Sequence, residues 1–475
     1  MFERLQFYVD GAWVDPVAGV KVLDVINPAT EQCAGRISLG SAGDVDAAAK
    51  AARTAFAGWS TTTRDDRLAM LERVRNEYEK RFDEIAAAIT IEMGSPSWLS
   101  RHAQAAMGTA HLQTAIEVLE NYRFSEQRAT TTIVKEPIGV CGFITPWNWP
   151  INQIVCKVAP ALAVGCTMIL KPSEIAPFSA MILAEVLHAA GLPKGVFNLV
   201  NGDGASVGEA ISRHPDVDMV SITGSTRAGI AVAKAAADTV KRVHQELGGK
   251  SPHIVLDDAD LAAAVTSGVT TLMINSGQSC NAPARMLVPR SKMREAAQIA
   301  KTAAEALRVG PPEADVQMGP VASEVQWQRV QRLIQAGIDQ GATLVTGGTG
   351  RPDGLDSGYY ARPTIFADVT NDMRIAREEI FGPVLAMIPY DGVEEAIQIG
   401  NDTPYGLAAY VHGRDQDVLR RVANALRVGQ VVINGASPDI MAPFGGYKQS
   451  GNGREWGDHA FAEFLEIKSL IGASA

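Results

Sequence analysis

The amino-acid sequence predicts an α/β protein built around a doubly wound, parallel sheet. The main observation is a run of alternating strand and helix patterns between residues 167 and 256. Such alternation is typical of parallel sheets with helices on both faces. The predicted strands are 167–171, 196–200, 219–223 and 253–256, and the predicted helices are 178–190, 205–213 and 227–240. A second α/β series follows residue 250 and runs to a strand predicted at 431–434.

The segments before this run have a different pattern. Residues 7–40 contain short strand and turn patterns, and apolar residues recur at helix spacing from Asp44 onward. Long amphipathic helices are predicted over 64–93 and 98–124. Residues 125–143 then become β-rich, with alternating side chains. A short β segment between helices predicts an arm that leaves its domain.

Composition places the chain among ordinary globular proteins. It has 475 residues, 46% hydrophobic and 20% charged, with a net charge of −10, and about two to four domains are expected at this length. No block of Lys and Arg indicates a nucleic-acid surface. The apolar stretch 155–170 is interrupted by Lys157 and Pro160, so no membrane span is expected.

The cysteines and histidines argue against a disulfide framework and a metal. The five cysteines are an odd number and form no CxxC pair, which fits reduced thiols in the cytoplasm. The first residues contain no apolar segment typical of a secretory signal, so a cytoplasmic protein is expected. The eight histidines show no HExxH spacing, and no catalytic metal is predicted.

Cys280 is the strongest candidate for chemistry. A cysteine is more often a small buried hydrophobe, and Cys141, Cys156 and Cys166 lie in apolar runs. Cys280 instead follows the polar turn 275–279, so its thiol can face a cleft. A thiolate is a strong nucleophile when a base and an oxyanion partner are near.

Two other stretches could supply those partners. Glu246 precedes Gly248 and Gly249, which permit close approach of another chain or a ligand, although an isolated glutamate is more often a surface residue. Asn148 is enclosed by two Trp and two Pro, so its amide could be a fixed oxyanion donor instead of a turn residue.

Three further stretches could hold a dinucleotide at strand ends. Residues 171–174 (Lys-Pro-Ser-Glu) end a predicted strand, and their Lys and Glu could bond ribose hydroxyls. Gly204 and Gly208 form a loose glycine pattern. Residues 223–226 end a strand and open a helix, where free N–H groups could meet a pyrophosphate.

With these residues identified, the chain resembles the aldehyde dehydrogenase superfamily of the non-acylating, NAD(P)-dependent kind. The resemblance covers nearly the whole length and is carried by motifs in a fixed order: 146–150 PWNWP, 171–174 KPSE, 222–225 ITGS, 246–250 ELGGK, 277–280 GQSC, 378–383 EEIFGP and 443–448 PFGGYK.

The resemblance implies a fold, an assembly and site roles. The fold would be a Rossmann-like NAD-binding domain (1–120 and 138–247), a catalytic α/β domain (248–448) and a small β oligomerisation arm (121–137 and 449–475) in a homodimer or homotetramer. Cys280 would be the nucleophile, Glu246 the general base and Asn148 an oxyanion donor, with Lys157 and Glu455 associated with proton movement. The implied cofactor-binding residues are Ile144, Thr145, Trp147, Lys171, Ser173, Glu174, Gly204, Gly208, Gly224, Ser225, Leu247, Glu379 and Phe381.

The reaction implied is oxidation of an aldehyde to a carboxylic acid through a cysteine thioester. Glu174 would accept the ribose hydroxyl and repel a 2′-phosphate, so NAD is predicted over NADP. An apolar aldehyde is the expected substrate, with a long oxo acid as the alternative, and a cage for betaine aldehyde is only partly visible. The expected pocket residues are Trp149, Cys156, Ser279, Asn281, Met441 and Phe444. Two other functions stay open at this point, a cysteine esterase and a non-catalytic relative.

Overall fold

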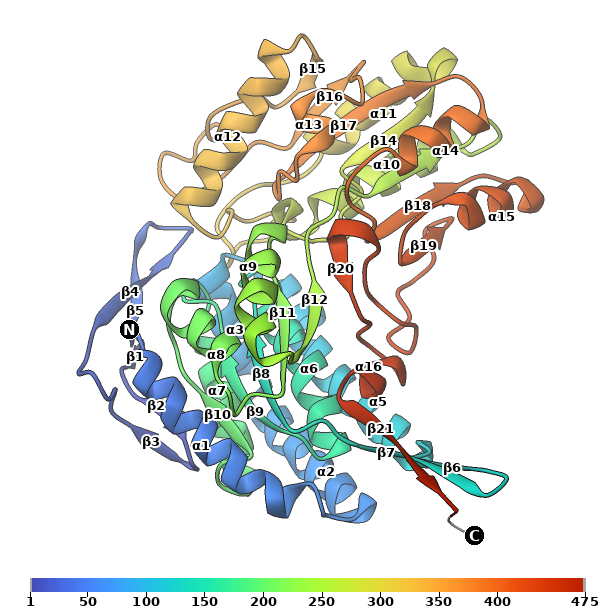
Figure 1. Cartoon of the computed structure of the whole chain (residues 1–475). Coiled ribbons are helices and arrows are strands. Elements are labelled where there is room, and N and C mark those ends of the chain that lie inside the picture. The colour runs from blue at the N-terminus through green and yellow to red at the C-terminus, as the bar shows by residue number, and fades with distance from the viewer. Residues whose placement is uncertain (1, 473–475) are drawn as a thin grey trace.

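A computed structural model describes residues 2–472 of the protein. A mixed eight-stranded sheet forms the lower half of the molecule in Figure 1. Its five central strands pair in parallel, which confirms the predicted sheet, whereas the pairs at both edges are antiparallel. The order is β20 (Gly451–Asn452), β12 (Arg242–Glu246), β11 (Met219–Thr223), β8 (Val140–Ile144), β9 (Thr167–Lys171), β10 (Phe197–Leu199), β2 (Phe7–Val9) and β3 (Ala12–Val14).

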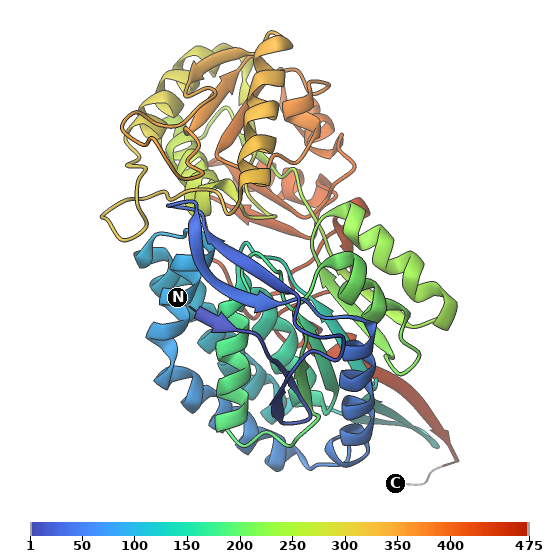
Figure 2. The same ribbon diagram turned by 90° about the vertical axis from the view of Figure 1, so that its left-hand side faces the viewer.

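Helices cover both faces of this sheet and bury the largest apolar core (Figures 1 and 2). Their apolar residues recur at helix spacing, and α6 packs against α5 and α2. The helices are α1 (Ala42–Trp59), α2 (Arg64–Lys80), α3 (Phe82–Met93), α4 (Ser97–Leu99), α5 (Ala106–Asn121), α6 (Pro150–Val164), α7 (Phe178–Ala189), α8 (Glu209–Arg213) and α9 (Thr226–Ala236).

A second sheet of seven strands forms the upper half in Figure 1. Its pairs are parallel except for β15 with β16. The order is β15 (Thr343–Thr346), β16 (Thr364–Ala367), β17 (Val384–Tyr390), β14 (Arg285–Pro289), β13 (Pro252–Val255), β18 (Ala408–His412) and β19 (Gln430–Ile433). Its helices are α10 (Leu261–Met273), α11 (Met293–Glu305), α12 (Glu324–Asp339), α13 (Arg374–Arg377), α14 (Val393–Asn401) and α15 (Gln416–Ala425).

Two small sheets complete the described chain. One joins β1 (Phe2–Arg4), β5 (Gln32–Ser38) and β4 (Val22–Asn27) beside the first sheet. The other projects from the body at the lower right of Figure 1 and joins β21 (Leu465–Ile471), β7 (Thr131–Pro137) and β6 (Ser125–Arg128). A short helix, α16 (His459–Glu463), precedes β21. None of the helices within residues 2–472 combines the length and apolarity that crossing a membrane requires.

Several predicted elements differ from the observed ones. The helix predicted over 64–93 is two helices, α2 and α3, because the backbone at Arg81 leaves helical geometry. The helix predicted over 227–240 ends at Ala236 and continues as a 3₁₀ turn. Strands β12 and β16 and helix α6 were not predicted as such. Their sequences are polar, short or interrupted by Pro160, so they lack a clear period.

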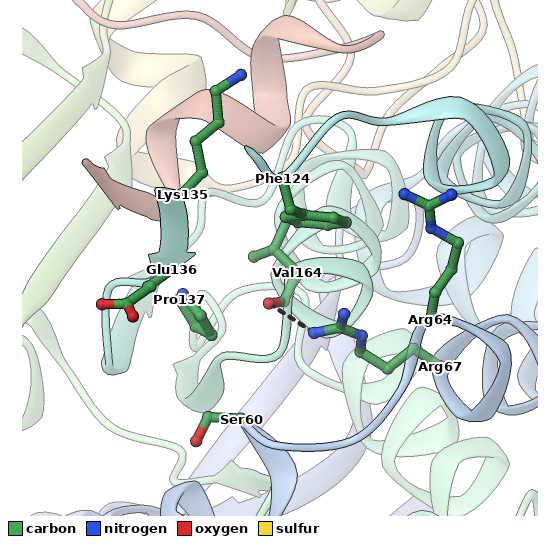
Figure 3. A pocket seen from close by; sticks show the side chains of 8 residues that line it. All are labelled: Ser60, Arg64, Arg67, Phe124, Lys135, Glu136, Pro137 and Val164. Carbon is green, nitrogen blue, oxygen red and sulfur yellow. Dashed lines mark hydrogen bonds between the residues drawn. The ribbon is translucent and has the colours of Figure 1, made fainter. Parts of the chain in front are cut away.

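Two arginines anchor the root of the projecting sheet. Arg67 of α2 donates from Nη1 to the carbonyl of Val164, the last residue of α6, at 2.9 Å (Figure 3). Its guanidinium lies 5.4 Å from the ring centroid of Phe124. Arg64 donates to the carbonyls of Glu120 and Tyr122 at the end of α5. Cations at helix C-termini satisfy orphan carbonyls and the helix dipole, so these arginines have a structural role.

Candidate active site

The candidate site lies at the carboxyl ends of the parallel strands of the first sheet. Ile144 pairs with Lys171 on one side and with Ile222 on the other, and Thr223 pairs with Glu246. The chain that leaves each of these strands therefore emerges at one edge. Open α/β sheets bind ligands at this edge.

The turn before Cys280 is held in an unusual backbone conformation. Asn275, Ser276 and Gly277 have φ values of 56°, 57° and 74°, a left-handed region that disfavours most side chains. A Cβ on Gly277 would lie 2.1 Å from the carbonyl oxygen of Gly382, so glycine is required there. The turn ends the helical chain after α10 and leaves Cys280 partly accessible.

Asn148 is fixed beside this turn by reciprocal hydrogen bonds. Its Nδ2 donates to the carbonyl of Gln278 at 3.0 Å, and Asn275 donates to the backbone carbonyl of Asn148 at 2.7 Å. The next residue, Trp149, donates from Nε1 to the Ser279 hydroxyl at 2.8 Å. Asn148 and Trp149 thus bind Gln278 and Ser279, the two residues before Cys280. These hydrogen bonds hold the Asn148 amide close to the thiol.

Glu246 is a buried carboxyl with unused oxygens. Its side chain is 2% exposed, and neither Oε1 nor Oε2 has a well-formed hydrogen bond to any residue in the described part of the chain. Burial, aided by the charge of Glu455, raises the pKa of Glu246 well above its ordinary value, and the N–H of Gly446 offsets this only in part. Burial also raises the pKa of the Cys280 thiol, with Glu246 the next largest cause. The charge of Glu246 therefore acts on the thiol.

A buried ion pair lies behind Glu246. Lys157 of α6 binds the Glu455 carboxylate, and the Cys156 thiol donates to the same carboxylate at 3.4 Å. Burial alone would raise the pKa of Glu455, but the charge of Lys157 holds it below its ordinary value. Burial would lower the pKa of Lys157, and Glu455 raises it instead.

One group of predicted cofactor residues lies at the ends of β8, β9 and β11. Lys171 Nζ contacts Glu174 at 3.2 Å, and Ser225 caps α9 by accepting from the N–H of Ala228. A Cβ on Gly224 would meet nothing closer than 3.9 Å, and a Cβ on Gly204 would meet nothing within 4 Å. This edge thus offers a helix N-terminus, a charged pair and open space.

Three more residues predicted to bind the cofactor lie close to the ends of β8, β9 and β11. Gly208 lies beside Ile144 and Lys171, with 3.8 Å from the position of a Cβ to each side chain. The Ser173 hydroxyl accepts from Ile175 and shapes the turn after β9. Leu247 is buried and packs against Gly229 of α9.

A second group comes from the other half of the protein. The Glu379 carboxylate accepts from the N–H of Gly249 at 2.9 Å, and burial raises the pKa of Glu379 to about 7. Phe381 lies edge-on to Trp147, with ring centroids 5.4 Å apart. The two halves therefore meet across this edge of the sheet.

An aromatic wall borders the site on the side of Glu455. Phe444 stacks on Trp456 at 4.7 Å, and Phe444 and Glu455 exchange backbone hydrogen bonds. Met441 is 43% exposed at the rim, where its carbonyl lies against Gly457. Asn281 is held by the Tyr410 hydroxyl, which donates to its carbonyl at 3.1 Å. Of the residues predicted for the substrate pocket, Trp149, Ser279 and Asn281 thus lie at the turn that carries Cys280.

Sequence reasoning missed two residues that shape the site. Asn275, which fixes Asn148, could have been found from its place before Gly277, since asparagine tolerates the left-handed region. Lys250 is 1% exposed, its Nζ has no partner among residues 2–472, and burial lowers its pKa to about 7. No local pattern predicts that burial. Within the same residues, no group of His, Cys, Asp and Glu is placed to hold a metal ion.

This geometry combines a thiol, a fixed amide donor and a buried carboxyl of raised pKa. A thiol and an adjacent donor can form and stabilise a tetrahedral adduct at a carbonyl carbon. A carboxylate held beside an acylated thiol can accept a proton from water. The arrangement can therefore acylate the thiol and hydrolyse the product.

Comparisons with known proteins agree over the full length. The profile described as "Aldehyde dehydrogenase family" matches residues 13–470. The 3-succinoylsemialdehyde-pyridine dehydrogenase of a Pseudomonas species is 58% identical, with 99% of each chain covered. A crystal structure of aldehyde dehydrogenase C from Pseudomonas syringae in complex with NAD+ and octanal superposes with a TM-score of 0.98 at 52% identity, covering 99% of this chain and 97% of that one. The Mycobacterium tuberculosis aldehyde dehydrogenase in complex with NAD+ gives 0.96 at 40% identity, with 99% and 98% covered.

Proposed function

Because this chain belongs to the aldehyde dehydrogenase family and oxidises an aldehyde with NAD, we propose that Cys280, Asn148 and Glu246 perform the chemistry. The observation that carries the proposal is that all three meet at the carboxyl edge of the parallel sheet, although they come from different segments. The product is a free carboxylic acid, because the buried Glu246 carboxyl has no side-chain hydrogen-bond partner among the described residues and can activate water.

Cys280 begins the reaction as the nucleophile. Its thiolate attacks the aldehyde carbon, and the carbonyl oxygen becomes an oxyanion. The side-chain amide of Asn148 and the backbone N–H of Cys280 donate to that oxyanion. Loss of one such donor typically reduces the rate by about 10²–10³-fold.

The residues at the strand ends fit a dinucleotide. The buried hydroxyls of Thr145 and Thr223 have no hydrogen-bond partner among the described residues, although they lie where two adjacent strands end. Ser225 at the start of α9 would hold the pyrophosphate, Lys171 and Glu174 the adenine ribose, and Glu379 the nicotinamide ribose. NAD, when bound, supplies the hydride acceptor for the oxidation.

Glu246 completes the reaction by hydrolysis. Once the hydride has left, Cys280 carries the acyl group as a thioester. Glu246 takes a proton from water, the hydroxide adds to the thioester carbon, and the C–S bond breaks. The acid leaves, and the thiolate is regenerated.

The test follows NADH absorbance in wild type, Cys280→Ser and Glu246→Gln. Cys280→Ser should form no NADH above background. Glu246→Gln should keep the burst of NADH in the first turnover, whereas its steady rate should fall by about 10²-fold or more, because general-base catalysis typically contributes that much. A steady rate equal to that of the wild type would show that Glu246 is not the base.

Cofactor preference depends on Glu174. Its carboxylate would accept the ribose 2′-hydroxyl, whereas a 2′-phosphate at that place would be repelled. The ammonium of Lys171 is already paired with Glu174, so it is not free to bind a 2′-phosphate. We therefore propose that NAD is preferred over NADP.

The substrate is an apolar aldehyde. Phe444, Trp456 and Trp149 border the site, whereas the nearby Lys157 is bound to Glu455. Two similar proteins support this choice, since one is crystallised with octanal and the name of the other describes a pyridine ring with a succinic semialdehyde chain.

The assembly proposed is a cytoplasmic homodimer or homotetramer. The projecting sheet exposes Ile467 and Ile471 at 71% and 85%, and such apolar strand edges favour pairing with another subunit. The five free cysteines fit a reducing compartment. The domain division 1–120 with 138–247, 248–448, and 121–137 with 449–475 remains a proposal. The sheets support it, although β20 joins the edge of the first sheet.

A further inference from the structure

The turn that precedes the candidate nucleophile is anchored through its side chains to segments far away in the sequence. The Ser276 hydroxyl donates to the carbonyl of Gly319 at 2.8 Å. Oε1 of Gln278 accepts from the N–H of Ala322 at 2.9 Å. Both of these contacts use backbone atoms of the loop before α12. The third anchored residue of the turn, Asn275, is instead bound by a side chain.

The side chain that binds Asn275 is Gln104, a fully buried residue of the π-helical turn Ser100–Ala105. Its Nε2 donates to Oδ1 of Asn275 at 3.3 Å and to the Ser95 hydroxyl at 3.2 Å, so each of its two N–H groups has an acceptor. Its Oε1 has no hydrogen-bond partner within residues 2–472, so the amide is held through its N–H groups alone. Turns of π-helix are rare and occur frequently at functional sites.

Gln104 determines which way the amide of Asn275 points. Nδ2 of Asn275 donates to the backbone carbonyls of Asn148 at 2.7 Å and of Gln278 at 3.3 Å. A carbonyl oxygen can only accept, so these two carbonyls require the nitrogen of the amide on their side and leave its oxygen on the other. A donor must then face that oxygen, and Gln104 supplies it. Without the donor, the buried Oδ1 of Asn275 would be unpaired, which is costly.

The carbonyl of Gln278 connects this hydrogen bond to the oxyanion donor. It accepts from Nδ2 of Asn275 and also from Nδ2 of Asn148. Asn148 is therefore held at its backbone by Asn275, and at its side chain by a carbonyl that Asn275 also binds. A chain of buried hydrogen bonds thus runs from Gln104 through Asn275 to the Asn148 amide. Misplacing a catalytic group by about 1 Å can reduce a rate by about 10²-fold.

We propose that Gln104 is a positioning residue for the oxyanion donor: through Asn275 it holds Asn148 in the orientation that oxidation of the aldehyde requires. The inference rests on the proposed function, which gives Asn148 its role. It extends the site to the π-helical turn between α4 and α5. Gln104 is fully buried and acts only through its neighbours.

A double-mutant cycle tests this chain of hydrogen bonds. Gln104→Met keeps the unbranched shape of the side chain without its N–H donors. In the NADH assay with octanal it should lower kcat/KM by about tenfold or more, as expected for the loss of one buried hydrogen bond, with the Kd for NAD unchanged. In the Asn148→Ala background the same substitution should change kcat/KM by less than about twofold, because the group that it positions is gone. A merely structural role would give the same factor in both backgrounds.

Ser100→Ala is the matched control, because Ser100 is equally buried in the same π-helical turn but bonds to Thr90 and Ser95 instead of the turn before Cys280. It should leave kcat/KM within about twofold of the wild type. Gln104→Leu serves as a second variant, and thermal unfolding identifies any variant that fails to fold. A wild-type kcat/KM in the folded Gln104 variants, an equal loss in both backgrounds, or an equal loss in Ser100→Ala would overturn the inference. An Asn148→Ala enzyme as fast as the wild type, or a wild type that forms no NADH, would instead refute the proposed function on which the inference rests.

Discussion

Removing the charge of Lys157 should make the stability of the fold strongly dependent on pH. Lys157 and Glu455 are 1% and 4% exposed in their side chains and bind each other. Removing one partner of such a buried pair typically costs about 3–5 kcal/mol, because the other charge is left uncompensated. Lys157→Met should therefore raise the pKa of Glu455, because burial would act on that carboxyl without the opposing charge.

The dependence of folding stability on pH has opposite signs in the wild type and in Lys157→Met. In the wild type the pKa of Glu455 lies below its ordinary value, so the pair stabilises the fold above the unfolded pKa and less as the pH falls. In Lys157→Met the folded pKa of Glu455 lies above the unfolded value of about 4.3, so stability falls as the pH rises above that value.

Thermal unfolding followed by circular dichroism would measure this effect. The difference in Tm between wild type and Lys157→Met should be small at about pH 5 and large at about pH 8. The double variant Lys157→Met/Glu455→Gln should recover most of the loss at the higher pH, because no buried charge remains. A Tm difference that is the same at both pH values, or a double variant no more stable than the single one, would refute the reasoning.

Three further predictions concern single residues. Asn148→Ala should lower kcat/KM by about 10²–10³-fold in the NADH assay, with NAD binding unchanged, because it removes an oxyanion donor. Glu174→Ala should raise the ratio of kcat/KM for NADP over NAD by about tenfold, equal to about 1.4 kcal/mol, because it removes a charge beside the 2′ position. Burial raises the pKa of Glu92 to about 7 against its hydrogen bonds from Phe178 and Ser179. Its ionisation therefore weakens the fold by about 3 kcal/mol as the pH rises from about 4.5 to about 7, and Glu92→Gln should remove that slope in urea unfolding.

Each of these predictions has a result that contradicts it. For Asn148→Ala it is an unchanged rate with a folded protein. For Glu174→Ala it is a cofactor ratio equal to that of the wild type. For Glu92→Gln it is a dependence of the unfolding free energy on pH that matches the wild type in that interval.

The sequence predicted several short apolar strands and missed β12, which carries Glu246. The strands at 167–171 and 219–223 were found because they are short, apolar runs between turns. Strand β12 was missed because it reads Arg-Val-His-Gln-Glu. Its His244 is buried against Ser221, and its Glu246 is buried without a side-chain hydrogen-bond partner in the described part of the chain. Polar residues that belong to a functional site thus interrupt the recurrence of apolar residues by which a strand is predicted.

The candidate site residues were predictable where a motif contained them. Cys280, Glu246 and Asn148 stand out from the residues that flank them, and the family resemblance assigned their roles. His111 could not be found in this way, since its significance depends on Asn152 and Trp456, which contact it from another helix and from a loop. A period along one helix shows which residues share a face, but it does not show what that face contacts.

The late position of β20 and Glu455 in the chain has a consequence for synthesis. Domains generally begin to fold from the N-terminus while translation continues, at about 5–20 residues per second. Lys157 is made nearly three hundred residues before its counterion. Strand β12 likewise lacks its outer neighbour until β20 has been made. On the ribosome, therefore, the first sheet has an open edge and a lysine without its acid until residues 451–455 emerge. A premature stop before Gly451 should give a chain that retains the second sheet's strands yet depends on chaperones for solubility.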